Sequence, residues 1–311
     1  MAWVAQSGLT VPAPEASIDG SFLQVIDGVQ IDVLNWLSGN TLDAVLPSMD
    51  LIDQVRIFHD LGCDMAKLHI VSDTWPGAAS CARPSWDGEG MLGGNPLWDR
   101  FWENPGLSTK QRDLFCDFRA KAHGNLDAVA PSLDFGLIDA DLVPANVMVQ
   151  KDGLHFIDFD DGGFGFRQFD VATALLKHRP LPKFEALKTA LLYGYHARRS
   201  LDTTVLDLFL ALRAMTYVGW NIARAGEDQT DARNALFIMP AEDRAVSTST
   251  FSYSTHRTLK LAHELPTLSI LSIFDHHEAK RNVGHAIKYS LQRPLPRQYL
   301  QHSKKPAAFA K

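Results

Sequence analysis

Three oxygen-bearing side chains in the middle of the chain stand at a spacing suited to phosphoryl transfer. Asp141 opens the segment Asp-Leu-Val-Pro-Ala-Asn, which ends at Asn146, and Asp158 follows twelve positions after Asn146. The first carboxylate can accept the proton of an attacking hydroxyl. The amide and the second carboxylate offer hard oxygen ligands to Mg²⁺ bridging nucleotide phosphates. The pattern therefore indicates a base at Asp141 and a metal pair at Asn146 and Asp158.

Two short predicted strands hold the metal pair. Residues 147–149 and 154–157 are apolar runs around the turn Lys151-Asp152-Gly153, which predicts a hairpin. Asn146 then lies at its entrance and Asp158 at its exit, so both side chains can face one ion. An isolated D-x-x-x-x-N segment is more often a cap or turn, and the following hairpin is what favours chemistry here.

The remaining pattern predicts an α+β fold with strands early and helices late. Apolar runs on both sides of Asp27-Gly28, within 21–34, predict a first hairpin. Residues 76–105, rich in Gly, Pro and Trp, read as an ordered connection. Trp98, Trp102 and Trp220 are candidates for core packing or for a substrate cleft. Apolar spacings of three and four predict helices at 50–69, 110–127, 171–176, 184–195 and 205–222, with a further one at 279–290.

Three segments carry a resemblance to a known family. They are Gly136–Leu142 (GLIDADL), Phe156–Ala172 (FIDFDDGGFGFRQFDVA) and Leu34–Gly39 (LNWLSG). Over roughly 11–225 the chain resembles the aminoglycoside phosphotransferase and choline kinase-like family, in particular its homoserine kinase-like and bacterial Ser/Thr-kinase-like branches. The resemblance implies a protein-kinase-like two-lobe fold, with an incomplete small β lobe and a larger helical lobe.

The resemblance assigns a role to each matched residue. Asp141 would be the general base for the acceptor hydroxyl, and Asn146 and Asp158 would bind Mg²⁺. Asp170 would be structural, hydrogen-bonding back to the catalytic loop. The literal Asp134-Phe135-Gly136 precedes the catalytic loop, which is the wrong order for the metal-binding motif of protein kinases, so it reads as the start of a strand.

The resemblance also implies ATP as cofactor and a division of the chain. Asn35, Trp36 and Leu37 would form the hinge that meets adenine. Residues 1–37 would be the remnant of an N-terminal lobe and hinge, 38–240 the helical lobe, and 241–311 an atypical basic tail, partly disordered. The implied reaction is ATP- and Mg²⁺-dependent phosphorylation of a small-molecule alcohol such as homoserine or another amino alcohol.

Two departures from the family pattern support an alternative. The family's glycine-rich hairpin and strand lysine should precede Pro12-Ala13-Pro14, so the chain looks N-terminally truncated. The histidine two residues before the catalytic aspartate is Asp139 here, and its charge would raise the pKa of Asp141. The alternative is a catalytically inactive kinase-like fragment that serves as a binding module or is the product of a truncated gene.

Composition bounds the partners and the compartment. The net charge is −6, with the acidic surplus ahead of Ala245, which argues against nucleic acid as a partner. No apolar run approaches the ~20 residues of a membrane span. Three cysteines without paired spacing fit a reducing, cytoplasmic setting. A sheet that lacks strands leaves an open edge near 22–34, which predicts a dimer or aggregation there.

Overall fold

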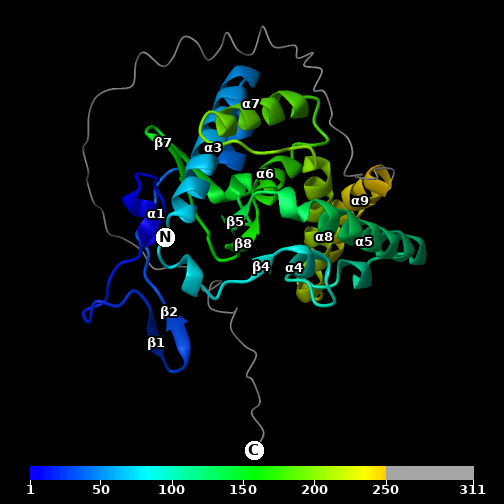
Figure 1. Ribbon diagram of the computed structural model, residues 1–311, viewed down its shortest axis with the longest axis horizontal. Coiled ribbons are helices and arrows are strands. Elements are labelled where there is room, and N and C mark those ends of the chain that lie inside the picture. Colours follow the sequence, from blue (N-terminus) through cyan, green and yellow to red (C-terminus); the bar gives the residue numbers. More distant parts are fainter. Residues whose placement is uncertain (250–311) are drawn as a thin grey trace, which may run out of the picture. The chain divides into compact units, whose positions relative to one another are not determined.

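The computed structural model describes residues 1–249, and Figure 1 shows their helices and strands. Most predicted helices are confirmed, with ends that differ by a few residues. The α-helices are α1 (Ala2–Gln6), α2 (Leu42–Val45), α3 (Leu51–Asp73), α4 (Gly88–Leu92), α5 (Thr109–Val129), α6 (Arg167–Leu176), α7 (Phe184–His196), α8 (Leu206–Trp220) and α9 (Thr230–Ser249). Short 3-10 turns fall at Leu46–Ser48, Ala78–Ser80, Phe101–Glu103, Ala130–Ser132, Pro144–Asn146 and Ile222–Arg224.

The strands of the described residues form three small sheets. β1 (Gln24–Ile26) pairs with β2 (Val29–Ile31), β6 (Val147–Gln150) lies between β3 (Asn40–Thr41) and β7 (Gly153–Phe156), and β8 (Gly163–Phe166) lies between β4 (Ser85–Trp86) and β5 (Phe135–Ile138). The two predicted hairpins, β1–β2 and β6–β7, are both confirmed. The small sheets among many helices agree with the predicted α+β class.

The β6–β7 hairpin brings the backbone at Asn146 next to the backbone that precedes Asp158. Its strands are antiparallel, with Val147 opposite Phe156. One step further, the amide of Ile157 donates to the carbonyl oxygen of Asn146 at 3.0 Å. Asn146 and the residue that precedes Asp158 are therefore in backbone contact.

The sheet β4–β8–β5 leads into the loop 139–146, which contains Asp141. β5 is antiparallel to β8, and Ile138, its last residue, lies opposite Gly163. β4 and β8 were not predicted, because one has two residues and the other is half glycine. A Cβ at Gly165 would collide with the side chain of Ile138. Glycine here serves close packing between strands, although its low β propensity hides the strand.

Helices α3 and α7 pack with their backbones almost touching, and Figure 1 shows them side by side. A Cβ at Gly62 would overlap the carbonyl oxygen of Leu191, and one at Gly194 would overlap that of His59. Two glycines, one on each helix, thus permit this approach. The first turns of the chain join the same helix, because the indole of Trp3 donates to the carbonyl oxygen of Val71 at 3.0 Å.

Helix α9 was not predicted, and it lies against α5 and α8 (Figure 1). It contains Pro240 and continues to Ser249, so the division expected between 240 and 241 falls inside a helix. Ile238, Ala241 and Ala245 are buried. The apolar face therefore outweighs the cost of an internal proline. The predicted helix at 279–290 lies outside the described residues.

The hairpin β1–β2 exposes most of its apolar side chains. The large apolar residues that are exposed here are Phe22, Leu23, Val25, Ile26, Val29, Ile31, Val33 and Leu34. A two-stranded sheet has two unpaired edges, which can pair with another strand. Within residues 1–249, none of the helices has the length and apolar character needed to cross a membrane.

Candidate active site

The candidate catalytic loop, residues 139–146, joins β5 to β6 and contains Asp141 and Asn146 in direct contact. The side-chain nitrogen of Asn146 donates to the backbone oxygen of Asp141 at 2.9 Å and to its Oδ2 at 3.1 Å. Pro144 begins the 3-10 turn that ends at Asn146, and its fixed φ suits the first position of such a turn. The turn brings residues five positions apart into contact.

Asp158 lies two residues after the end of β7 and has a left-handed backbone conformation, with φ of 64°. Few non-glycine residues adopt this region, and strain of this kind gathers at functional sites. Partial burial raises the pKa of the Asp158 carboxyl above its ordinary value, and the charges of Asp160 and Asp141 raise it further. Asp158 and Asp141 therefore lie close enough to influence each other.

The donor set fits a divalent cation that a nucleotide also binds. Since the amide nitrogen of Asn146 is bound to Asp141, its Oδ1 is the atom left to coordinate a metal. Asp158 adds a carboxylate, and Mg²⁺ commonly takes one or two protein ligands plus phosphate oxygens and waters. Among residues 1–249, no group of three His, Cys, Asp or Glu side chains is arranged to hold a metal. Two protein ligands at Asn146 and Asp158 would leave the remaining positions of a Mg²⁺ ion to phosphate oxygens and waters.

Asp170, in the first turn of α6, hydrogen-bonds to the candidate catalytic loop, as predicted. Its Oδ2 accepts from the amide of Asp139 at 3.0 Å, and its Oδ1 accepts from the amide of Ala140 at 2.8 Å. Ala140 has a φ of 67°. The two hydrogen bonds to buried amides offset the cost of this unusual conformation.

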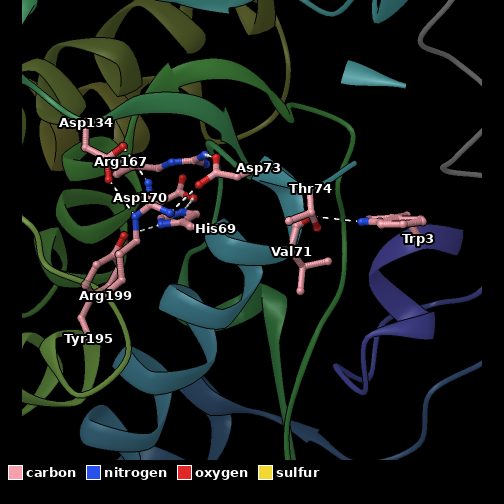
Figure 2. Close-up of polar contacts among 10 residues, drawn as sticks. All are labelled: Trp3, His69, Val71, Asp73, Thr74, Asp134, Arg167, Asp170, Tyr195 and Arg199. Carbon is pink, nitrogen blue, oxygen red and sulfur yellow. Dashed lines mark hydrogen bonds and ion pairs between the residues drawn. The ribbon is translucent and has the colours of Figure 1, made fainter. Parts of the chain in front are cut away.

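A buried histidine supports Asp170 from behind (Figure 2). His69 of α3 lies 3.0 Å from Asp170 through Nε2, and the hydroxyl of Tyr195 lies 2.7 Å from its Nδ1. Burial lowers the pKa of His69. A neutral imidazole that donates through Nε2 and accepts the Tyr195 hydroxyl proton at Nδ1 satisfies all three groups. His69 is thus a core histidine with both ring nitrogens hydrogen-bonded.

Ion pairs beside this histidine join four elements of the chain (Figure 2). Arg199 binds both carboxylate oxygens of Asp134, at 2.8 Å each, and also pairs with Asp73. The fully buried Arg167 pairs with Asp73 from the other side. Asp134, the first residue of the misleading Asp-Phe-Gly motif, is therefore engaged in a structural pair. Such two-point arginine contacts fix orientation as well as charge.

Asp139 is the most unusual carboxyl in the loop. Burial, followed by the charges of Asp170 and Asp141, raises its pKa well above the ordinary value. Its Oδ1 accepts from the amide of Asp141 at 3.1 Å, but no group among the described residues hydrogen-bonds to its buried Oδ2. A buried unsatisfied oxygen of this kind destabilises the fold.

The predicted effect of Asp139 on Asp141 requires a correction. The pKa of Asp141 is raised, but burial is the largest cause, and Asp161 is the carboxylate that adds to it. Arg213 opposes both by its positive charge. The predicted direction is right, and the repulsion between Asp139 and Asp141 is expressed in the raised pKa of Asp139. The sequence could not indicate the larger influences on Asp141, because only the fold brings Asp161 and Arg213 to the site.

Arg213 of α8 is the site residue that the sequence reading missed. Its guanidinium is fully buried and forms an ion pair with Oδ1 of Asp141. It also donates to the carbonyl oxygen of Ala140 and to the hydroxyl of Tyr217, both at 3.2 Å. The available signal was a single charged residue inside the largely apolar stretch Leu208–Val218, because a buried charge needs a partner.

The candidate cleft tryptophans occupy different surroundings. Trp98 lies 4.5 Å from the guanidinium of Arg213 and donates to Oδ1 of Asp161 at 3.1 Å. Trp102 stacks on Arg119 at 4.2 Å, and Trp220 on Arg224 at 3.5 Å. Trp98 is therefore tied to the surroundings of Asp141. Whether any of the three contacts an acceptor stays a prediction.

The proposed hinge residues lie next to the first residues of the chain. The side-chain oxygen of Asn35 accepts from the backbone amide of Ala13 at 2.6 Å, and the backbone amide of Asn35 donates to the carbonyl oxygen of Ala13 at 3.0 Å. Trp36 is 83% exposed, and Leu37 is half-buried. Contact of these residues with adenine stays a prediction, as do the roles of Asp141, Asn146 and Asp158.

With this geometry in hand, comparison with known proteins identifies the family. The sequence model of the phosphotransferase enzyme family matches residues 1–209. The chain belongs to this family. Asp141, Asn146 and Asp158 all lie inside the matched part, whereas Arg213 lies beyond it.

Individual members of the phosphotransferase family show the same likeness. A homoserine kinase from Rhodopseudomonas palustris (strain BisA53) is 28% identical over 221 residues, which are 67% of this chain and 60% of that protein. The chain therefore matches about three fifths of this relative's length. A microcompartment-associated aminopropanol kinase is 26% identical in sequence, with a TM-score of 0.67 over 81% of each chain.

More distant structures support the fold alone. The amicoumacin kinase hAmiN, in complex with AMP-PNP, Ca²⁺ and Ami, is 18% identical, with a TM-score of 0.60 over 78% of this chain and 75% of that one. The predicted kinship and the α+β protein-kinase-like fold are confirmed.

Proposed function

We propose that this member of the phosphotransferase family transfers the γ-phosphoryl group of ATP, with Mg²⁺, to a hydroxyl of a small amino alcohol. Membership in the family supports phosphoryl transfer to small molecules. Homoserine-like acceptors come first, because a homoserine kinase and an aminopropanol kinase are both similar to the chain. Aminoglycoside-like and choline-like acceptors follow. The three cysteines are free thiols, and we propose a cytoplasmic location.

One observation carries the proposal: the contact between Asn146 and Asp141. The amide of Asn146 donates to Oδ2 of Asp141, which fixes the carboxylate and turns the amide oxygen away from it. One residue can thus orient the base and present a metal ligand. Asp158 follows from the neighbouring strand end, in backbone contact through Ile157.

The residues present have separate tasks in the proposed reaction. Asp141 would accept a hydrogen bond from the acceptor hydroxyl and orient its oxygen toward the phosphorus. Asn146 and Asp158 would hold Mg²⁺, which neutralises charge on the phosphates during transfer. Positioning and electrostatic stabilisation supply most of the catalysis in such reactions, since the transferred group is highly charged.

The charge of the site favours a cationic acceptor. Asp160 and Asp161 follow Asp158 after a single intervening residue, Phe159, and the charge of Asp161 raises the pKa of Asp141. Beside this group of carboxylates, the ammonium of an amino alcohol would gain favourable Coulomb energy. The same charges would repel an acidic acceptor.

The test is ATP consumption by the pure chain with Mg²⁺ across homoserine, 1-amino-2-propanol, choline and an aminoglycoside. We expect turnover with at least one acceptor and a loss of at least about 100-fold in Asp141→Asn. The exposed Asp117 of α5 gives a matched control, Asp117→Asn, which should retain the activity. No turnover on any acceptor, with nucleotide binding retained, would support the inactive binding module instead.

A further inference from the structure

Arg213 is a buried cation at the candidate site, and the proposed reaction assigns no role to it. Arg213 projects from the middle of α8, and its side chain has no exposed surface. Removing a guanidinium from water costs several kcal/mol unless its partners are well placed. The partners of Arg213 therefore indicate what its burial serves.

Arg213 grips the catalytic loop at two successive residues. Its Nη2 pairs with Oδ1 of Asp141, and its Nη1 donates to the carbonyl oxygen of Ala140 at 3.2 Å. The amide of Ala140 is bound on its other side by Asp170 at 2.8 Å. The left-handed residue is thus held through both its amide and its carbonyl group, from α6 and from α8.

The carboxylate of Asp141 is fixed in the same way from two sides. Oδ1 meets Arg213, and Oδ2 meets the amide nitrogen of Asn146 at 3.1 Å. Each carboxylate oxygen has a second lone pair, so one remains to accept the hydrogen of a hydroxyl. With both oxygens engaged, rotation of the carboxylate is restricted.

Aromatic rings in turn fix the position of Arg213. Its guanidinium carbon lies 4.5 Å from the ring centre of Trp98, 4.4 Å from that of Tyr217 and 5.5 Å from that of Phe169. The hydroxyl of Tyr217 also accepts from Nη2 at 3.2 Å. Burial alone would lower the pKa of Arg213, but Tyr217 and Asp141 together raise it. The cation is therefore held rigidly and stays charged.

We propose that Arg213 is a positioning residue for phosphoryl transfer, which fixes the carboxylate of Asp141 in the orientation that accepts the acceptor hydroxyl. The inference rests on the proposed function. It assigns a role to a residue beyond the part that the family sequence matches, since that match ends at residue 209. Arg213 acts through Asp141 and needs no contact with substrate.

The test compares steady-state kinetics of three variants with a matched arginine control. Arg213→Met removes the charge and keeps much of the length, Arg213→Lys keeps the charge, and Tyr217→Phe removes one hydrogen bond only. Arg119→Met is the control, because Arg119 also stacks on an indole, at 4.2 Å, and donates to a backbone oxygen, that of Leu92.

We expect Arg213→Met to lower kcat about 100-fold, since a misplaced catalytic group costs about this much. The KM for ATP should stay within about twofold, because the lost interaction serves the reacting group alone. Arg213→Lys should recover about tenfold, Tyr217→Phe should lose less than Arg213→Met, and Arg119→Met should match the parent. A folded Arg213→Met with parental kcat, or a loss seen wholly in KM, would overturn the inference.

A second measurement separates this inference from the proposed function. If the parent chain turns over no acceptor, the proposed function fails, but hydrogen–deuterium exchange of peptides covering 139–146 still reports how the loop is held. Faster exchange of these peptides in Arg213→Lys and Tyr217→Phe, with an unchanged exchange rate in Arg119→Met, would support the positioning role. Unchanged exchange in both variants would refute it, even if Arg213→Met does not fold.

Discussion

Replacement of the buried carboxyl at 139 should stabilise the protein at neutral pH. In Asp139→Asn, Oδ1 would still accept from the amide of Asp141, as Oδ1 of Asp139 does at 3.1 Å. The new amide nitrogen would take the place of Oδ2, which has no partner among the described residues. The carboxylates of Asp170 and Asp141, which raise the pKa of Asp139, would attract this nitrogen. Removing a buried carboxyl that must either keep its proton or carry a charge beside other carboxylates should add about 1–3 kcal/mol to the free energy of unfolding at neutral pH.

The pH dependence of this gain distinguishes charge from packing. The folded-state pKa of Asp139 lies above its unfolded value of 3.8, so the folded state keeps a proton that the unfolded state has lost. The carboxyl therefore costs stability as pH rises above 3.8 and through the folded pKa. Asparagine has no such cost, so the advantage of Asp139→Asn should be small near pH 4 and largest near pH 8.

The assay is urea unfolding of Asp139→Asn and its parent at several pH values between 4 and 8. The difference between the two proteins at each pH cancels the titration of groups that they share. The exposed Asp117 again gives the control, and Asp117→Asn should show no difference that grows with pH. An Asp139→Asn protein that is less stable than its parent at pH 8, or equally shifted at every pH, would refute the reasoning.

Three further outcomes can be measured by unfolding or scattering. Gly194→Ala should lose about 1–3 kcal/mol, because its Cβ would meet the backbone of α3, whereas Gly124→Ala, in open space on α5, should gain up to about 1 kcal/mol by helix propensity. Burial lowers the pKa of His178 from 6.5 to about 4, so stability should fall as pH drops through that interval, and His178→Gln should remove at most about 3 kcal/mol of the loss. The exposed hairpin predicts a dimer in light scattering that Ile26→Lys converts to monomer, and a monomeric parent at high concentration would contradict this.

Local chemistry explains why part of the site could be predicted from the sequence. Asp141 and Asn146 are joined by one turn, and Asn146 and Asp158 by one hairpin. Such short-range geometry follows from strand alternation and from Pro144, with little help from the rest of the fold. Asp170, in the first turn of α6, lies 30 and 31 positions from the two amides that it binds. Its structural role was implied by the family resemblance, and its bonds to the loop agree with that role.

Long-range packing explains what the sequence did not show. Arg213 reaches Asp141 from a helix 72 positions away, and Trp98 reaches Asp161 across 63 positions. Neither distance leaves a periodic signal. Helix α9 was missed for a related reason, because Pro240 reads as a break until the packing of Ile238 and Ala241 is known.

The distribution of positive charge separates the roles of the two aspartates. The carboxylate of Asp141 forms an ion pair with the buried, permanently charged Arg213. Asp158 has the charges of Asp160 and Asp141 beside it, and no Lys or Arg among residues 1–249 forms an ion pair with its carboxylate. A divalent cation would gain most at Asp158, where negative charge is uncompensated. At Asp141, a metal would have to compete with a guanidinium already in place, so the carboxylate there is better suited to receive a hydroxyl proton than to bind metal. Neutralising Arg213 should therefore make Asp141 more able to bind a metal, and should also loosen the orientation of its carboxylate toward the acceptor hydroxyl.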